Sequence, residues 1–236
     1  MTGTERYERQ TALPGIGQEG QERLARSKVL VAGAGGLGSP LCLYLAAAGI
    51  GTIGIADFDT VSISNLQRQI LYNEADLGKA KADLAASRIK AISSATEVHV
   101  HGKITAGNAE AIISGYDIVA DGCDNYATRY IINDACMTQK KPFVYGAVCG
   151  FEGQVSIFCA GEKPCSYRDL YPDEKAMLSL EADKRVIGPV AGITACVQAS
   201  EVIKLVCGYG TQLIGKLWTI NALTMETNLV ELDYAR

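Results

Sequence analysis

Short apolar runs, separated by glycine-containing turns and by segments of helical spacing, recur along the chain. The runs at residues 29–32 and 52–56 are short and apolar, which is typical of strands buried on both faces of a parallel sheet. Between them, residues 41–48 are rich in leucine and alanine and predict a helix. Strands that alternate with helices in this order indicate an α/β fold. We therefore expect a Rossmann-like, doubly wound and mostly parallel sheet.

The rest of the chain extends this pattern. Helices are expected over residues 17–26, 108–113, 126–137 and 188–206, and a further helix should end at about residue 92. Strands are expected over residues 96–100, 142–148, 154–159, 216–220 and 228–232, and a further strand should begin at residue 116. The glycine-containing turn at 150–153 suggests that its two flanking strands pair antiparallel, so the C-terminal part of the sheet is expected to be antiparallel. We expect a single domain over 1–236, with one half at 28–150 and a sheet extension at 151–236.

The turn after the first strand holds closely spaced glycines, namely Gly33, Gly35, Gly36 and Gly38. In a strand–turn–helix context they allow a tight turn, backbone approach to a phosphate, and close packing of helix on strand. The helix start offers free N–H groups to an anion. Asp57, 19 residues after Gly38, ends the next strand, where a Rossmann-type site places an acid on the ribose. The pattern indicates NAD, FAD or ATP; the alternative is a turn that only packs the helix.

The segment from Asp57 to Gln69 is dense in side chains that bind phosphate or metal. Asp59 could hold a Mg²⁺ ion, and Arg68 carries the planar fork suited to a phosphate. The amides are those of Asn65, Gln67 and Gln69. Hydride transfer does not need such a cluster, so the segment favours a nucleotide other than NAD.

Further polar residues are expected at the same edge of the sheet. Lys79 and Lys81 start a helix, where the dipole disfavours cations, so a bound anion or plain exposure explains them equally well. A buried strand then runs into a turn that holds Asp121, Asp124 and Asn125. Because the carboxyl ends of parallel strands line one crevice, these side chains should face the glycine turn.

Composition narrows the class of protein. The chain has 236 residues, 48% of them hydrophobic, and a net charge of -4 with both signs mixed. The absence of a basic patch argues against nucleic acid, and the polar amino terminus and the absence of any apolar run of transmembrane length argue against a membrane. Its eight cysteines form no Cys-x-x-Cys pair and read as reduced core thiols. We expect a soluble, cytoplasmic protein.

Residues 160–186 differ in character from the rest. The segment 173–185 holds seven charged residues among thirteen and shows little periodicity, so we expect a mobile loop or lid there. Gly188-Pro189 then starts a long helix that Gly208 ends.

Together these segments resemble the MoeB/ThiF/HesA family of ubiquitin-activating-enzyme-like adenylyltransferases, over nearly the whole chain. The matching segments are Arg6-Tyr-x-Arg9-Gln10, the glycine turn 33–38, Asp57-Phe-Asp-Thr-Val-Ser-x-Ser-Asn-Leu-Gln-Arg-Gln69, Asp76-x-Gly-x-x-Lys81, Cys123-Asp-Asn125, Ala127-Thr-Arg129, 150–154 and Gly188-Pro-Val. The resemblance implies that the C-terminal Gly-Gly carboxylate of a ubiquitin-like sulfur carrier (MoaD/ThiS type) attacks the α-phosphate of ATP. An acyl-adenylate forms and pyrophosphate leaves, for molybdopterin, thiamine or related sulfur-transfer biosynthesis.

The resemblance also implies roles for individual residues. Arg68 and Lys81 would contact the phosphates, and Asp124 would support Mg²⁺ and the reacting centre. The other nucleotide-binding residues would be the glycines of the turn, Asp57 on the ribose, Asp59, Asn65 and Gln69 at the triphosphate, and Asn125. Arg9 matches an arginine that family members insert from the neighbouring subunit, which implies a homodimer.

Two departures from the family pattern alter what we expect. The family commonly carries two Cys-x-x-Cys pairs for zinc, but Ser166 and Asp169 occupy the first pair's positions and residues 232–236 lack the second. We therefore expect no zinc site. Some members have a cysteine in the segment before Gly188, but residues 178–186 have none, which argues against a covalent relay there.

Three other readings stay open. A relative could adenylate a peptide end or a tRNA base, although the absence of a basic patch counts against tRNA. A nicotinamide-dependent dehydrogenase would leave Arg68, Lys81 and Asp124 without a clear role. A non-catalytic scaffold fits the missing zinc ligands but not the intact polar cluster.

Overall fold

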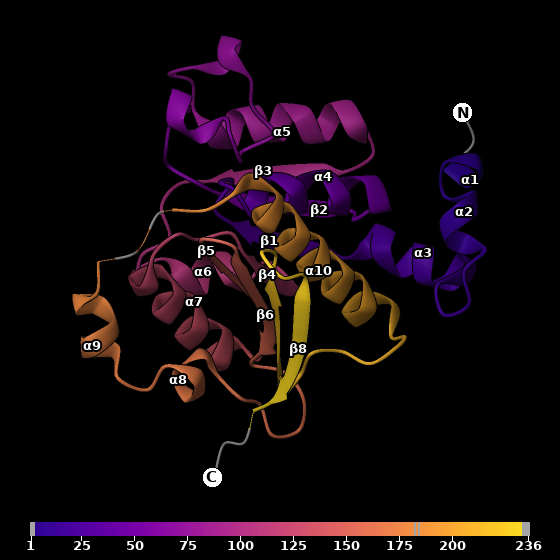
Figure 1. Cartoon of the computed structure of the whole chain (residues 1–236). Coiled ribbons are helices and arrows are strands. Elements are labelled where there is room, and N and C mark those ends of the chain that lie inside the picture. The colour runs from indigo at the N-terminus through magenta and orange to yellow at the C-terminus, as the bar shows by residue number, and fades with distance from the viewer. Residues whose placement is uncertain (1–2, 182, 184, 233–236) are drawn as a thin grey trace.

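The sheet contains β1 (Lys28–Ala32), β2 (Thr52–Ala56), β3 (Glu97–His101), β4 (Ile118–Asp121), β5 (Phe143–Cys149), β6 (Glu152–Phe158), β7 (Lys216–Asn221) and β8 (Glu226–Glu231). The structure is a computed structural model that describes residues 3–181, 183 and 185–232. The strand order is β3-β2-β1-β4-β5-β6-β7-β8 (Figure 1). β1 to β5 pair in parallel, and β6, β7 and β8 extend the sheet with antiparallel pairing. The expected fold class is confirmed.

Helices fill the connections. They are α1 (Gly3–Arg6), α2 (Glu8–Thr11), α3 (Gly17–Arg26), α4 (Gly38–Ala48), α5 (Lys81–Ile92), α6 (Ala109–Ile113), α7 (Tyr126–Gln139), α8 (Tyr167–Leu170), α9 (Glu174–Ser179) and α10 (Gly188–Cys207), with single 3₁₀ turns η1 (Ile63–Asn65) and η2 (Glu74–Asp76). Each longer element lies within a few residues of its expected place. The elements that sequence analysis did not predict, α1, α2, α8, α9, η1 and η2, are too short to show a periodicity.

Two clusters of buried side chains lie on opposite faces of the sheet. Along β1, Val29 and Val31 belong to one cluster, whereas Leu30 and Ala32 belong to the other, as the period of a strand requires. α3, α4, α5 and α10 complete the first cluster, and α6, α7 and α8 the second. The sheet is therefore buried on both faces, which explains its near-continuous apolar runs.

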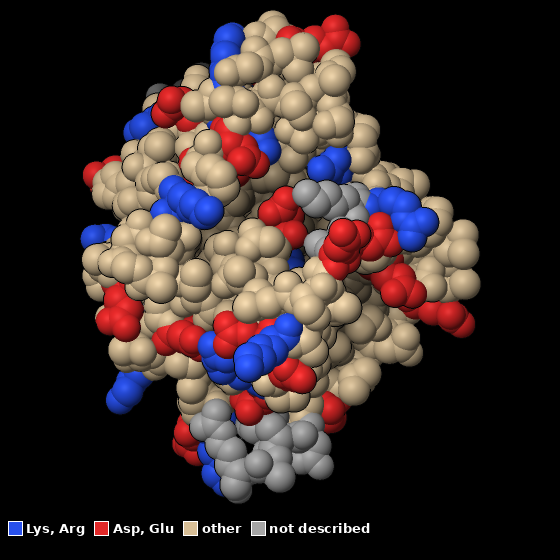
Figure 2. Space-filling view, turned by 90° about the vertical axis from the view of Figure 1, so that its left-hand side faces the viewer, with Lys and Arg blue, Asp and Glu red and all other residues tan. Residues whose placement is uncertain are grey.

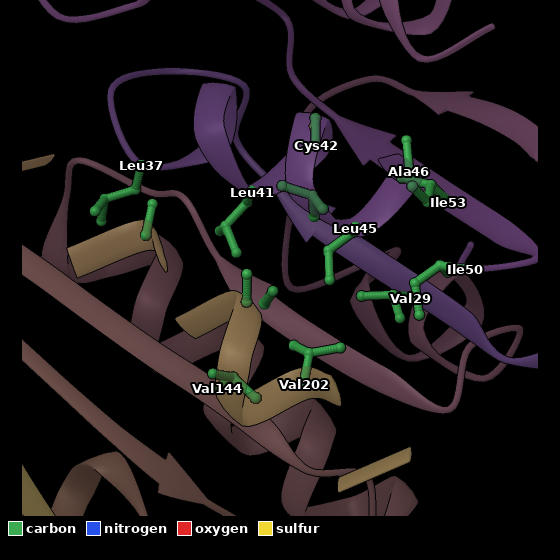
Figure 3. Packing of buried hydrophobic residues seen from close by; sticks show 14 of the residues in the cluster. Val29, Leu37, Leu41, Cys42, Leu45, Ala46, Ile50, Ile53, Val144 and Val202 are labelled. Carbon is green, nitrogen blue, oxygen red and sulfur yellow. The ribbon is translucent and has the colours of Figure 1, made fainter. Parts of the chain in front are cut away.

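The packing of α4 against the rest of the first cluster fixes the glycine turn that precedes this helix. Leu41 and Leu45 of α4 are fully buried, and they point toward the side of α10 that carries Val202 (Figure 3). Truncating a buried leucine to alanine costs about 2–5 kcal/mol. The amino terminus of α4 is thus held rigidly at the carboxyl end of β1.

α10 corrects one sequence-based expectation. An 18-residue stretch of this 20-residue helix has a mean hydropathy of 1.5, and the helix is long and apolar enough to cross a membrane by length and composition. The expectation that no run reaches that length is therefore wrong. Half of this stretch is buried inside the protein, where Ala195, Ala199 and Val202 join the first cluster. Glu201, 3% exposed, accepts a hydrogen bond from Leu213 N at 2.8 Å. Packing against the sheet accounts for the apolar character of α10.

The segment 173–185 also differs from expectation, because α9 occupies its first half. Asp173 caps this helix, with its side chain accepting a hydrogen bond from Ala176 N at 2.9 Å, and Arg168 pairs with Glu174 at 2.8 Å. Asp173 is a typical N-cap residue, so a local signal was present. Residues 182 and 184 lie outside the described residues, and the mobility of the segment stays a prediction.

Candidate functional site

The glycine turn packs so tightly that two of its positions exclude any side chain. Gly33 has φ +99°, and a Cβ there would lie 2.5 Å from Gly122 O. A Cβ at Gly38 would lie 1.9 Å from Gly33 O. Both glycines are therefore required by the close approach of β1, β4 and α4. A Cβ at Gly35 or Gly36 would meet no neighbouring atom closer than 3.4 Å. Both glycines line a pocket, so their backbone is accessible to a ligand.

This pocket is a cavity of about 330 Å³ at the carboxyl ends of the central strands. Predicted site residues that line it, besides Gly33, Gly35 and Gly36, are Asp57, Asp59, Arg68, Gln69, Lys81, Asp124 and Asn125. They come from the ends of β1, β2 and β4, from the segment between β2 and α5, and from the first residue of α5. Figure 2 views the side that carries α9, where acidic and basic side chains gather around a hollow. The structure thus brings together residues that are far apart in the sequence.

Asp57 is held in place by the backbone of two turns. Its Oδ2 accepts a hydrogen bond from Ala34 N at 2.7 Å, and its Oδ1 accepts one from Asp59 N at 2.8 Å. Burial raises the pKa of this carboxyl, although both hydrogen bonds act in the opposite direction. Each oxygen keeps a free lone pair, so the group can still accept hydrogen bonds from a pair of hydroxyls.

Lys81 is a buried cation at the start of α5. It is 5% exposed, and its Nζ lies 3.1 Å from Asp59 Oδ2. The Lys81 backbone N also donates to Asp59 O at 2.9 Å. Since a lysine is almost never buried unpaired, Asp59 explains why Lys81 can lie here. The pair presents an ammonium, with donors to spare, to the cavity.

Arg68 and Gln69 line the cavity next to the glycine turn. The Arg68 Cδ would lie 3.4 Å from a Cβ at Gly36, and its Nη1 donates to Ser64 O at 3.2 Å. Gln69 is 4% exposed, and its Oε1 has no hydrogen-bond partner among the described residues. A buried acceptor without a donor costs about 1–3 kcal/mol. Such an atom is suited to a donor that a ligand supplies.

Asp124 and Asn125 lie where β4 gives way to α7. Both residues are exposed and line the cavity. Asn125 is also the N-cap of α7, since its Oδ1 accepts from Thr128 N at 2.9 Å. Asp124 has only the Asn125 amide near it, at 3.4 Å, among the contacts of the described side chains. Its carboxylate is therefore available to a ligand or a metal ion.

Asp121 faces the same edge of the sheet but is already paired. It is fully buried, its Oδ2 lies 2.8 Å from Arg129 Nε, and its Oδ1 accepts from Cys123 N at 2.8 Å. Arg129 Nη2 also donates to Cys123 O at 2.7 Å and Gly146 O at 3.1 Å. Burial alone would lower the pKa of Arg129, but the Asp121 carboxylate raises it above its usual value. The pair fixes the turn that presents Asp124.

Three predicted residues do not line the cavity. Gly38 lies beneath it, packed on Gly33. Asn65 Oδ1 accepts from Ser62 N at 3.2 Å and so caps η1, the turn that precedes Arg68. Arg9 is exposed on α2, and its neighbour Gln10 donates to Ala48 O, at the far end of α4, at 3.0 Å.

The structure adds residues to which sequence analysis gave no role. Phe58 and Lys103 line the cavity beside Asp57, and Tyr145, Gln154 and Tyr171 line it beyond Arg129. Phe58 and Lys103 follow the ends of β2 and β3 closely, so strand ends were the available signal. Tyr171 lies in the segment between β6 and α9, which gave no usable pattern.

Cys149 is an exposed thiol that also lines the cavity. Burial raises its pKa, and the nearby Asp183 raises it further. Because the thiolate is the nucleophilic form, this environment does not activate it.

The fit of the pocket to metals can be judged from its donors. No group of three or more His, Cys, Asp or Glu that could hold a metal ion occurs among the described residues. Mg²⁺ usually binds through one or two carboxylates together with substrate phosphates. Asp124, with its free carboxylate, and Gln69 Oε1, an unpaired acceptor, suit an ion that arrives with a nucleotide.

Ser166 and Asp169, which occupy the positions of the family's first Cys-x-x-Cys pair, form a helix cap. Ser166 N and Oγ donate to Asp169 Oδ2 at 2.7 and 2.9 Å, which caps α8. The zinc content of the protein stays a prediction.

The parallel sheet, the tight glycine turn and the ribose-type acid at the end of β2 define a nucleotide-binding α/β protein. The sequence model described as the ThiF family matches residues 7–236. The chain belongs to this family.

Relatives are up to 45% identical to this chain over the aligned residues. A probable adenylyltransferase/sulfurtransferase MoeZ of Mycobacterium tuberculosis is 45% identical, over 93% of this chain and 58% of its own length. A probable molybdopterin-synthase adenylyltransferase of Porphyra purpurea is 45% identical, over 93% and 58%. The adenylyltransferase and sulfurtransferase MOCS3-2 of Zea mays is 44% identical, over 96% and 48%. The chain spans about half to three-fifths of these relatives.

Solved structures support the fold. PaaA superposes with a TM-score of 0.82 at 24% identity, covering 100% of this chain and 76% of that one. MccB of E. coli superposes with a TM-score of 0.82 at 21% identity, covering 98% and 70%. At this identity the likeness concerns the fold alone.

Proposed function

We propose that the protein uses ATP to adenylylate the C-terminal Gly-Gly carboxylate of a ubiquitin-like sulfur-carrier protein of the MoaD/ThiS type, in the cytoplasm, releasing pyrophosphate. The product would serve molybdopterin, thiamine or related sulfur-transfer biosynthesis. The observation that carries the proposal is the convergence of Asp57, Arg68, Lys81 and Asp124 around one cavity beside the glycine turn. Membership of the ThiF family and the adenylyltransferase names of the relatives support it.

The chemistry needs positive charge rather than a covalent nucleophile. The carrier carboxylate attacks the α-phosphate of ATP, the bond to the β-phosphate breaks, and pyrophosphate leaves with the electron pair. Arg68 and Lys81 would neutralise the charge that builds on the phosphates, since preorganised cations in a partly enclosed site stabilise such transition states. Mg²⁺ would supply further charge when bound with the nucleotide. Asp124 would hold it, and Asp57 would fix the ribose.

The proposal includes a homodimer with shared sites. Arg9 lies beyond the carboxyl end of α4, whereas the cavity lies at the amino end of this helix. Eleven helical residues span about 16 Å. Arg9 therefore lies far from the cavity of its own chain. A second copy, related by twofold symmetry, would supply Arg9 to this site.

The decisive experiment is ATP–pyrophosphate exchange with Mg²⁺ and each candidate carrier that ends in Gly-Gly. We expect exchange that depends on one carrier, and we expect Arg68→Ala and Asp124→Ala to abolish it while the circular dichroism spectrum is unchanged. Lys90→Ala, on the exposed side of α5, is the matched control and should retain the wild-type rate. ATP binding without exchange for any carrier would instead favour adenylation of another substrate.

Mixing two inactive variants tests the shared site. Arg9→Ala removes the residue given to the partner, and Arg68→Ala removes one kept in the chain's own site. After subunit exchange, half of the dimers would hold one complete site, so about a quarter of the wild-type rate should return. A mixture as inactive as its components would contradict the sharing of Arg9.

A further inference from the structure

The parallel pairing of β4 with β5 ends before either strand has passed the cavity. Its last registered pair is Ala120 with Val144. Beyond this pair the chain after β4 turns away and carries Asp124, whereas β5 continues beside β6 to Cys149. The diverging strands leave backbone carbonyl groups without their partners in the ladder, and buried carbonyl groups need donors. Side chains must therefore supply these donors.

Gln198 of α10 bonds both strands where their own pairing ends. Its side chain is fully buried, and its Nε2 donates to Asp121 O at 2.8 Å and to Val144 O at 3.1 Å. A Cβ at Gly146 would lie 2.4 Å from Gln198 Cδ, so β5 needs a glycine where the amide lies against it. α10 packs on this face of the sheet, and Val144 and Val202 both belong to the first cluster (Figure 3).

The Gln198 amide can take only one orientation. Both groups that it contacts are carbonyl oxygens, so only its NH₂ end can face them. Its Oε1 is then buried and has no hydrogen-bond partner among the described residues. Since an unpaired buried acceptor lowers the stability of the folded protein, filling space does not by itself account for an amide here. The bridge between the two carbonyl groups does.

Arg129 bonds the same divergence from the opposite face of the sheet. It lies on α7, which packs in the second cluster. Its Nη2 donates to Cys123 O, after β4, and to Gly146 O, on β5. Asp124 directly follows this stretch, and its own side chain is exposed. The place of Asp124 is therefore set by backbone that Gln198 and Arg129 hold from the two faces.

We propose that Gln198 is a positioning residue of the adenylylation reaction, and that it holds the turn after β4 so that the Asp124 carboxylate faces the cavity. The inference rests on the ATP-dependent function proposed above, in which Asp124 supports Mg²⁺ bound with the nucleotide. Gln198 does not itself line the cavity and acts through the carbonyl group of Asp121. Without the amide, the carbonyl groups of Asp121 and Val144 need other donors, and the turn shifts with them.

The test measures how strongly Mg²⁺ tightens ATP binding. Dissociation constants for ATP are measured by calorimetry with Mg²⁺ and with EDTA. Gln198→Met keeps the volume of the side chain and removes both donors, so it should weaken binding in Mg²⁺ roughly tenfold and leave the constant in EDTA unchanged. Gln198→Glu keeps the shape, and its neutral carboxyl group can donate to one of the two carbonyl groups, so its loss should be smaller.

Two further variants separate positioning from packing. Thr194→Val is the matched control, because Thr194 Oγ1 is buried one turn earlier on α10 and has no partner among the described residues. It should leave both constants unchanged. Asp124→Ala should remove the effect of Mg²⁺, and adding Gln198→Met to it should cause no further loss, because the two residues act on the same contact.

A loss of general structure would give a different result. Equal weakening in Mg²⁺ and in EDTA, unchanged binding in Gln198→Met, or a further loss in the double variant would overturn the positioning role. If circular dichroism shows that Gln198→Met is unfolded, Gln198→Glu is judged by the same criteria. Wild-type protein that binds no ATP would instead overturn the proposed function, and this inference with it.

Discussion

Residues 28–149 and the described part of residues 160–187 are held together in different ways. In the first region, strands and long helices bury alternating apolar positions on both faces of the sheet. In the second, α8 and α9 have four and six residues, and hydrogen bonds and ion pairs of polar side chains supplement the few side chains, such as Tyr167, that reach the second core cluster. Asn133 of α7, for example, accepts from Tyr167 N at 2.7 Å. The nucleotide half is built on a periodic core, and the later segment is attached to it by a few buried side chains and by individual hydrogen bonds.

The ion pairs of the two regions show the same contrast. Arg129 and Asp121 are almost fully buried and satisfy one another beneath the glycine turn. Arg168 bonds Asp134 and Glu174 at the surface, and its side chain and both carboxylates are about 40–50% exposed. Removing one buried partner leaves an uncompensated charge, whereas water replaces an exposed one. The two regions should therefore respond very differently to equivalent substitutions.

Arg129→Met should give the largest loss. The Asp121 carboxylate would lose the guanidinium that pairs with it while it is fully buried, and two carbonyl groups would lose a donor. The expected cost is about 3–5 kcal/mol in the free energy of unfolding, measured by urea denaturation. Arg168→Met, the exposed counterpart, should cost less than about 1 kcal/mol. Similar costs for the two variants would remove the distinction between the regions.

Gly38→Ala tests how strictly the glycine turn is packed. A Cβ there would lie 1.9 Å from the backbone oxygen of Gly33, so β1 or α4 must move. We expect a loss of about 3 kcal/mol in thermal or urea unfolding and weaker nucleotide binding. Gly192→Ala in α10 is the control, because nothing lies within 4 Å of its added Cβ. That variant should be neutral or more stable by up to about 1 kcal/mol.

The contrast also explains which features were predictable. Apolar runs report burial, so strands such as β2 and helices such as α3 could be located from the sequence alone. The carboxyl ends of those strands then indicated Asp57 and Asp124 as neighbours of the glycine turn, because parallel topology brings strand ends together. That α10 is a core helix could be read only from its packing, since its composition equally suits a membrane.

Pairs of side chains that lie far apart in the sequence leave no local sequence pattern. Asp121 was expected to face the crevice, but its pairing with Arg129 depends on a helix that begins five residues after β4 ends. Tyr171 reaches the cavity from a segment whose path is set by contacts to α7. Lys103 has no signature other than its place after β3. Such residues need the three-dimensional arrangement before they can be assigned.

Asn133→Ala probes the link between the two regions and should have an intermediate effect. Asn133 is 1% exposed, and without its Oδ1 the Tyr167 amide would be buried without an acceptor. The expected loss is about 2 kcal/mol by urea denaturation. Tyr167→Phe is the control within the same contact, because the Tyr167 hydroxyl is buried and has no partner among the described residues. If Tyr167→Phe costs as much as Asn133→Ala, the hydrogen bond is not what holds α8.

Asp134→Asn should have the smallest effect, and its pH dependence identifies the cause. Hydrogen bonds from Arg168 lower the pKa of Asp134 from its usual 3.8, so the folded state favours the carboxylate. The stabilisation is present above the unfolded pKa and is lost as pH falls through the folded one. At pH 7 the variant should lose about 0.5 kcal/mol, and the difference from wild type should shrink below about pH 4.

The pKa of Asp57 shifts in the opposite direction to the pKa of Asp134. Burial raises its pKa, so its contribution to stability is greatest below the unfolded pKa and is lost as pH rises through the folded value. A carboxyl group whose pKa is raised by burial is typical of a binding site, and one whose pKa is lowered by an arginine is typical of a structural contact. NMR titration of both carboxyl groups would measure the two shifts directly. If both pKa values shifted in the same direction, this would contradict the view that the Asp57 carboxylate lowers the stability of the fold whereas the Asp134 carboxylate raises it.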